Sequence, residues 1–271
     1  LFVIFKIIGY KNSSNLGEKI GSFFGPLFRN KKIILNNLRD SKVGSNDTER
    51  NKIIKSMWGN YGRILAEYPF IKYFRDSKLQ KYISINGQDV LDELKIKKKR
   101  EIFVSGHFNN FELMALQIEK SGIDLAAIYR PLNNIFLNRT MEKIRKNYIC
   151  KNQIKKGISG TRKVIEYVKK GSSIALMIDQ RVSEGIKSIL FGREAFTTTI
   201  PAQLIKKYEM EIIPVYIERD KKFFFKITFD KPISFGAEKS IKDITQELNY
   251  ILEKMILNNP DQWIWSHNRW K

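Results

Sequence analysis

From about the second third of the chain onward, short apolar runs alternate with longer amphipathic stretches. Residues 102–104, 125–129 and 173–178 are almost wholly apolar, as is typical of strands buried on both faces of a sheet. Between them, residues 110–120 and 134–147 place apolar side chains at helical spacing. This alternation predicts an α/β fold with a central, largely parallel sheet flanked by helices.

Two further apolar runs lie close together near the end of this pattern. Residues 212–217 and 223–229 are separated by a short charged stretch, so we predict two strands that pair with each other. A sheet that includes such a pair is mixed rather than wholly parallel. A long amphipathic helix is then predicted from Ser240 to about Asn258, stopped by Pro260.

The N-terminal part of the chain has a different pattern. Residues 1–40 and 47–74 show helical periodicity, and the first stretch combines phenylalanines with lysine and arginine. A basic amphipathic stretch of this kind lies either in a membrane interface or against the protein core. We therefore predict a single domain over residues 1–271, with a helical part over 1–75 that lies in a membrane interface or against the core, and an α/β core over 76–271.

No run of about 20 apolar residues is present, so no complete transmembrane helix is expected in this sequence. Its first ten residues, LFVIFKIIGY, are nonetheless almost wholly apolar and begin with Leu1. We expect them to be the end of a longer membrane-associated segment.

The charge balance indicates an anionic partner. The chain has 49 Lys and Arg against 28 Asp and Glu, for a net charge of +21. Nucleic acid, membrane phosphate and acidic proteins all fit such a charge. No nucleic-acid-binding motif is found and the basic residues are widely spread, so we expect no nucleic acid partner. The single cysteine, Cys150, excludes an internal disulfide, and with only two distant histidines no metal site is expected.

One of these histidines lies where a strand should meet a helix. His107 follows the strand 102–104, and Glu112 falls in the first turn of the next helix, for which Asn109 or Asn110 is a candidate N-cap. A carboxylate bonded to one imidazole nitrogen leaves the other nitrogen as a base. Since no protein nucleophile is evident, the substrate would supply a hydroxyl. The alternative is a structural histidine bonded to a carboxylate.

Two other polar residues follow predicted strands. Arg130 and Asp179, like His107, fall at the carboxyl ends of strands, where ligands bind in open α/β sheets. The guanidinium of Arg130 suits a phosphate or a carboxylate, or a structural salt bridge. Asp179 could orient Arg130, orient a substrate hydroxyl or cap a turn. Arg181 is either a phosphate contact or a solvated side chain.

These residues belong to a recognisable series of motifs. GHFNNFE at residues 106–112 matches the pattern H-x4-D/E of the glycerolipid and lysophospholipid acyltransferase superfamily. Followed by IYRPLNN at 128–134, ALMIDQ at 175–180 and WIWSHNRW at 263–270, it resembles the bacterial lipid A late acyltransferases more closely. The four blocks occur in the order found in that family and span most of the chain.

The resemblance implies transfer of a fatty acyl group from an acyl carrier protein thioester to a hydroxyl of a lipid A precursor. His107 would be the general base, assisted by Glu112, with no acyl-enzyme intermediate. The implied substrate-binding residues are Arg130, Asp179, Asn110 and Arg181. No cofactor is implied beyond the thioester co-substrate, a carrier protein or coenzyme A. The implied location is the cytoplasmic face of the bacterial inner membrane, with peripheral or N-terminal attachment.

Other functions remain open on the sequence. Related enzymes use coenzyme A thioesters and acylate phosphatidylinositol mannosides or lysophospholipids. A hydrolase would use water in place of the lipid hydroxyl. A basic membrane- or RNA-binding module without catalysis would also fit the charge.

Overall fold

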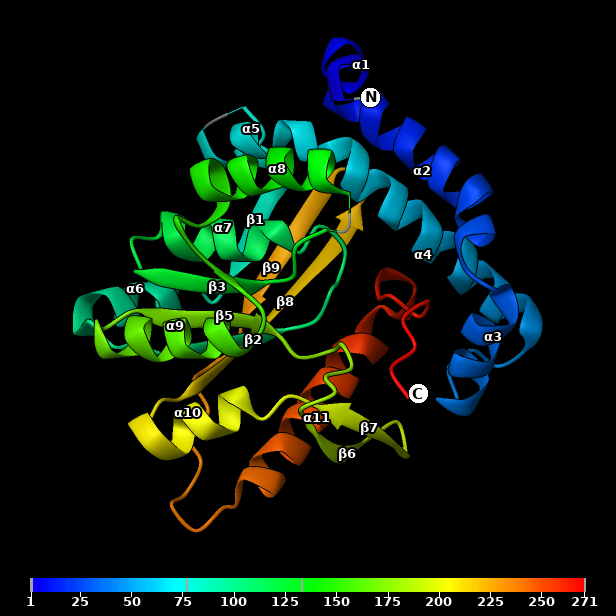
Figure 1. Cartoon of the computed structure of the whole chain (residues 1–271). Helices are drawn as coiled ribbons and strands as arrows, with labels where there is room; N and C mark the ends of the chain where they lie inside the picture. The colour runs from blue at the N-terminus through cyan, green and yellow to red at the C-terminus, as the bar shows by residue number, and fades with distance from the viewer. Residues whose placement is uncertain (1, 77, 133, 271) are drawn as a thin grey trace.

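The computed structural model describes residues 2–76, 78–132 and 134–270, and a mixed sheet forms the centre of the molecule (Figure 1). Within these residues, seven strands lie in the order β1-β9-β8-β2-β5-β3-β4. All neighbouring strands are parallel except β8 and β9. The predicted α/β fold with a mixed, largely parallel sheet is therefore confirmed. The strands are β1 (Ile83–Asn86), β2 (Ile102–Ser105), β3 (Leu125–Tyr129), β4 (Asn152–Lys155), β5 (Ser173–Met177), β8 (Ile212–Lys221) and β9 (Phe224–Phe229).

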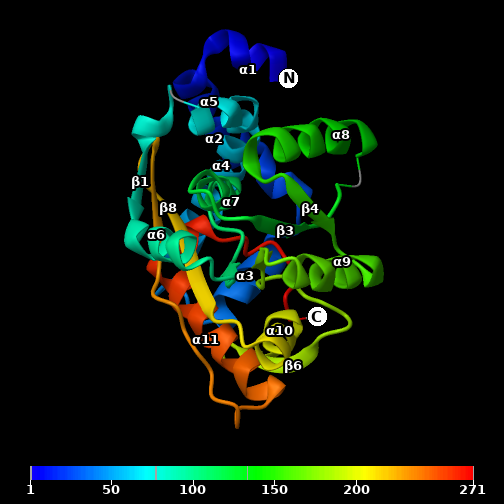
Figure 2. The same cartoon turned by 90° about the vertical axis from the view of Figure 1, so that its left-hand side faces the viewer.

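Helices flank this sheet, as the two perpendicular views show (Figures 1 and 2). They are α6 (Gln88–Lys97), α7 (Glu112–Lys120), α8 (Ile135–Ile144), α9 (Ile158–Lys169), α10 (Ile200–Tyr208) and α11 (Ile241–Asn258). A hairpin of β6 (Ile186–Leu190) and β7 (Arg193–Thr197) packs on α11. Strand β2, the apolar run before His107, is buried along its whole length between β8 and β5.

The N-terminal helices run along one side of the sheet (Figure 1). They are α1 (Phe2–Ile8), α2 (Tyr10–Phe28), α3 (Lys31–Asp40) and α4 (Asp47–Glu67), and α5 (Ile71–Asp76) follows and packs against α7. Helices α2 and α4 approach so closely that a Cβ at Gly17 would lie 2.4 Å from the carbonyl oxygen of Gly62. Glycine is therefore required at this crossing. None of the helices in the described parts of the chain is long and apolar enough to cross a membrane.

The turn after β2 differs from its prediction. Helix α7 begins at Glu112, and its N-cap residue Phe111 makes no side-chain capping bond. Asn109 and Asn110, the predicted caps, have other roles. Asn109 has a positive φ of 38°, and its Oδ1 accepts from the backbone N–H of Asn110. The amide of Asn110 donates instead to Glu67, which is far away in the sequence.

Glu67 is a fully buried carboxylate that joins several elements. Its oxygens accept from the Ser14 hydroxyl at 2.6 Å, the Asn110 amide at 3.0 Å and the Arg219 guanidinium at 2.9 and 3.0 Å. Burial of a charge is costly unless it is paired and hydrogen-bonded, and here it is both. Helix α2, the turn after His107 and strand β8 are thus held to the end of α4.

We expect Glu67→Gln to destabilise the protein by about 3–5 kcal/mol, because it leaves the buried Arg219 without its counter-charge. Urea unfolding followed by circular dichroism measures the change. Glu93→Gln is the matched control, since Glu93 is exposed and paired with the equally exposed Lys97; it should leave the unfolding midpoint unchanged. Equal midpoints for both variants would contradict a structural role for Glu67.

Candidate active site

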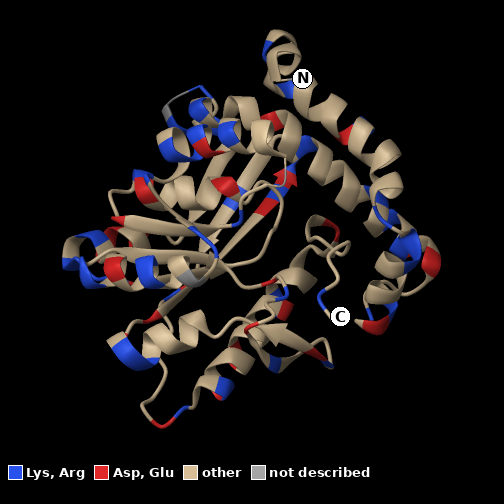
Figure 3. Ribbon diagram, in the orientation of Figure 1, with Lys and Arg blue, Asp and Glu red and all other residues tan. Residues whose placement is uncertain are grey.

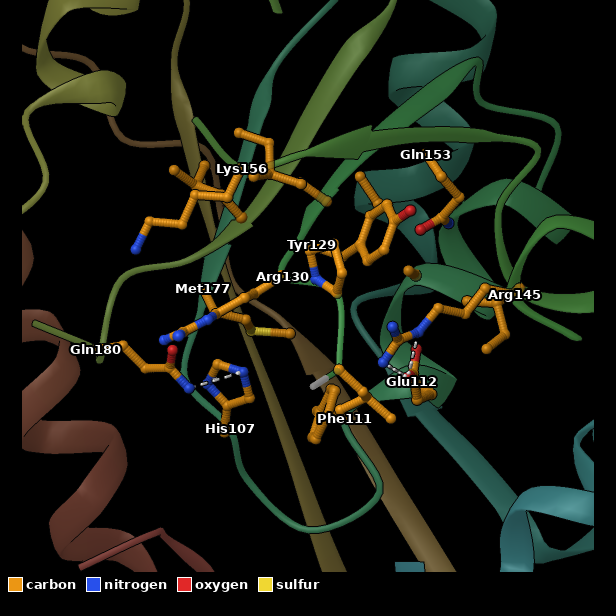
Figure 4. Close-up of a pocket in the computed structure, with 18 of the residues that line it drawn as sticks. His107, Phe111, Glu112, Tyr129, Arg130, Arg145, Gln153, Lys156, Met177 and Gln180 are labelled. Atoms are coloured by element: carbon orange, nitrogen blue, oxygen red, sulfur yellow. Dashed lines mark hydrogen bonds and ion pairs between the residues drawn. The ribbon is translucent and has the colours of Figure 1, made fainter. Parts of the chain in front are cut away.

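A cavity of about 520 Å³ opens beyond the carboxyl ends of β2, β3 and β5 (Figure 4). One part of its wall is apolar and includes Phe111, Ala115, Ala127, Ala175 and Met177. Polar and charged side chains line the rest: Tyr61, His107, Glu112, Tyr129, Arg130, Arg145, Gln153, Lys156, Gln180, Thr198 and His267. The cavity therefore lies at the strand ends where the sequence predicted a ligand site.

His107 is held in a fixed orientation by Asp179. The imidazole Nδ1 lies 2.7 Å from Asp179 Oδ1, and the backbone N–H of His107 donates to Oδ2 at 2.8 Å. The indole Nε1–H of Trp263 donates to the same Oδ2 at 2.9 Å. Because a carboxylate only accepts, the neutral ring carries its hydrogen on Nδ1. This leaves Nε2 toward the cavity, 3.5 Å from the side-chain amide of Gln180 (Figure 4).

The environment sets the protonation of this pair. Burial lowers the pKa of His107, but the charge and the hydrogen bond of Asp179 outweigh it and raise this pKa above its ordinary value. Burial raises the pKa of Asp179, whose side chain is fully buried, yet His107 and the hydrogen bonds bring this pKa below its usual range. Asp179 is therefore an ionised carboxylate that orients a basic imidazole.

Glu112 does not occupy the orienting position predicted for it. Its Oε1 accepts from Arg145 Nε at 2.8 Å, from Arg145 Nη2 at 2.6 Å and from the Tyr68 hydroxyl at 3.1 Å. The ring of Phe111 lies against the imidazole instead, with centroids 4.8 Å apart. Because α7 begins at Glu112, this carboxylate faces Arg145 in the π-helical turn Arg145–Ile149 rather than His107.

Arg145 and Trp263 are site residues that the sequence reasoning missed. Arg145 is buried and lines the cavity, and its Nη1 has no hydrogen-bond partner in the described parts of the chain. Both residues are far from His107 in the sequence, and no motif spacing connects either of them to it. Asp179 was predicted to bind substrate, whereas in the structure it orients His107. Its position at the end of a strand was the only feature of the sequence that pointed to this contact.

Arg130 lies at the cavity, as predicted, with a second cation beside it. Both Arg130 and Lys156 line the cavity, and no ion pair is found for either side chain among the described residues. Burial and then repulsion by Arg130 lower the pKa of Lys156. Figure 4 shows the guanidinium and the ammonium on the side of the cavity where Gln180 and His107 lie. Two adjacent cations of this kind suit a phosphate group.

Asn110 and Arg181 are not among the described residues that line the cavity. Asn110 is fully buried and bonded to Glu67, outside the set of residues that line the cavity. The guanidinium of Arg181 lies 5.3 Å from the Phe196 ring centroid and donates to the Ser183 hydroxyl. Its backbone N–H lies 3.3 Å from His267 Nε2.

The C-terminal tail forms part of the cavity wall. Ile264 and His267 line the cavity, whereas Trp263 and Trp265 are fully buried with ring centroids 4.7 Å apart. Burial lowers the pKa of His267, and its Nε2 accepts from a backbone N–H. His267 is thus a wall residue, and His107 is the histidine with a carboxylate behind it.

Comparisons with a family model and with individual known proteins point to the same family. Residues 1–271 match the family described as bacterial lipid A biosynthesis acyltransferase. The lipid A biosynthesis palmitoleoyltransferase of Escherichia coli K12 is 25% identical over 260 residues, covering 94% of this chain and 84% of that protein. The lipid A biosynthesis lauroyltransferase of the same organism is 23% identical over 252 residues, covering 90% and 79%.

One solved structure also aligns with this chain. The 1-acyl-sn-glycerophosphate acyltransferase PlsC of Thermotoga maritima aligns over 97% of this chain and 100% of that chain, with 14% identity and a TM-score of 0.44. The family match over residues 1–271 agrees with the four motif blocks. The chain belongs to the bacterial lipid A biosynthesis acyltransferase family.

Proposed function

We propose that this acyltransferase moves a fatty acyl group from an acyl carrier protein thioester to a hydroxyl of a lipid A precursor, with His107 as general base. The observation that carries the mechanism is the imidazole fixed at Nδ1 by the buried Asp179, with Nε2 at the cavity. An imidazole held in this way accepts a proton at Nε2.

The proposed reaction is a direct transfer. Nε2 of His107 takes the proton of the acceptor hydroxyl as the oxygen attacks the thioester carbonyl. The tetrahedral intermediate then expels the thiolate, which takes the proton from His107, so the ester and the thiol are the products. No acyl-enzyme is required. Burial raises the pKa of the Cys150 thiol to about 12, which makes it a poor nucleophile.

The apolar part and the charged part of the cavity wall suit different parts of the substrates. The apolar wall around Ala127, Ala175 and Met177 suits an acyl chain. Arg130 and Lys156 suit a phosphate of the lipid A precursor. Glu112 fixes Arg145, whose remaining N–H is available for the thioester carbonyl oxygen as negative charge develops.

The charged and apolar residues on the surface are the features that support our proposal of attachment to the cytoplasmic face of the inner membrane. Lys and Arg are spread over many elements (Figure 3), which suits anionic lipid and an acidic carrier protein. Helices α1 and α2 expose a row of large apolar residues: Val3, Ile4, Ile7, Phe23, Leu27 and Phe28. We propose that this row lies in the membrane interface.

His107→Ala should lower the transfer rate by about 10²- to 10⁴-fold or more, because general-base catalysis contributes that much. The assay is transfer from radiolabelled lauroyl carrier protein to a tetra-acylated lipid A precursor in detergent micelles. Release of free fatty acid without acceptor, followed in parallel, would indicate a hydrolase. Near-normal transfer by a folded His107→Ala protein would exclude His107 as the base.

Asp179→Asn should lower the rate and move the acid limb of the pH–rate profile to lower pH. The base must be neutral, so activity rises as pH rises through the pKa of His107, which Asp179 keeps high. Without the carboxylate this pKa falls, and His107 is neutral at lower pH. The measurement is kcat/KM against pH for both proteins. An unmoved acid limb would contradict the role of Asp179.

Glu112→Gln should impair transfer by releasing Arg145, with a smaller shift of the acid limb than Asp179→Asn produces. Because the two side chains act as one unit, the double variant Glu112→Gln, Arg145→Met should be hardly worse than either single variant. A double-mutant cycle on kcat/KM tests this. Fully additive losses would show that Glu112 acts independently of Arg145.

A further inference from the structure

An exposed apolar tip stands at the edge of the cavity, at the start of helix α8. We call Leu132, Ile135 and Phe136 the α8 rim. Ile135 is 66% exposed and Phe136 84% exposed, whereas Leu132 also lines the cavity. The α8 rim therefore presents apolar surface to the exterior at a point where substrate can enter.

Hydrogen bonds fix the rim in this position. The side chain of Asn134 caps α8 by accepting from the backbone N–H of Leu137 at 3.0 Å. The side chain of Asn138 accepts from the backbone N–H of Leu132 at 2.8 Å. The exposure of Ile135 and Phe136 thus belongs to an ordered, capped helix start.

The sequence around the α8 rim is strongly basic. Residues 130–156 contain eight Lys and Arg and a single acidic residue, Glu142. Arg139, Lys143 and Lys146 are exposed, and no ion pair involves them in the part of the chain that the structure describes. Glu142 is engaged by the Tyr129 hydroxyl and by Lys155. An apolar tip at the start of a helix that carries exposed cations further along matches the chemistry of an anionic bilayer surface.

We propose that the α8 rim inserts into the anionic leaflet that contains the acceptor, so that the cavity opens directly onto the lipid. The proposal rests on the proposed function in that the acceptor is a membrane lipid. It adds a second membrane contact, beside the cavity, to the apolar row on α1 and α2. The cations of this region would attract an acidic carrier protein as well, but the exposed Ile135 and Phe136 lie beside the cavity where the acceptor lipid would enter, so the bilayer is the occupant we propose.

The first test places an environment-sensitive fluorophore at Phe136→Cys and adds vesicles of phosphatidylcholine and phosphatidylglycerol without substrate. The control is Ile96→Cys, because Ile96 is 80% exposed but lies on α6, before the amino end of β2. Wild-type protein controls for labelling of Cys150, which is buried. We expect a blue shift and quenching by brominated lipid at position 136 but not at position 96.

This readout does not depend on acyl transfer, so it stands even if the proposed reaction fails. A probe at position 136 that stays in water while the protein binds vesicles would overturn the proposal. So would the absence of vesicle binding, or equal shifts at positions 96 and 136.

The second test measures transfer to acceptor embedded in vesicles. Phe136→Ser should raise the KM for the acceptor about tenfold, because burial of one large apolar side chain is lost. It should leave the KM for the acyl carrier protein unchanged, and Ile96→Ser should change neither. A rise in the KM for the carrier protein alone would assign the α8 rim to carrier-protein docking and reject insertion into the bilayer.

Discussion

The site depends on one buried carboxylate, Asp179, and on the donors that surround it. An ionised carboxylate without water must be paired and hydrogen-bonded, and here two donors come from His107 and one from Trp263. The same interactions that satisfy Asp179 fix the tautomer and orientation of the imidazole. They also attach the C-terminal tail to the end of β5, so the orientation of His107 and the position of the tail have a common cause.

A second buried carboxylate, Glu67, fixes the same turn from its other side. It holds Asn110, while Asp179 holds the backbone and ring of His107. The turn between β2 and α7 is therefore anchored at both ends, which leaves little freedom for the residues between them. Glu67 also binds Ser14 of α2, and so joins the N-terminal helices directly to the turn that carries His107.

The apolar and the positively charged side chains of the cavity lie on different parts of its wall, which suits an amphipathic substrate. Its apolar wall lies beside the imidazole, whereas Arg130 and Lys156 provide positive charge without carboxylate partners among the described residues. The α8 rim continues the apolar surface outward, next to further cations. A lipid with both acyl chains and phosphates would fit this combination, because the apolar and the charged parts of the wall can accommodate them together.

The sequence by itself determined most of the strands and helices, since their apolar periodicity is local, and it placed His107 and Arg130 at strand ends. It did not predict β4, whose sequence NQIK has only one apolar residue. Its motifs also indicated the family. The tertiary structure decided which carboxylate serves His107. Strands β2 and β5 are neighbours in the sheet, so Asp179, 72 residues away, meets the imidazole. Glu112, although near in sequence, starts a helix that directs it to Arg145. Strand order and helix direction arise from packing of the whole chain, and spacing along the sequence does not contain them.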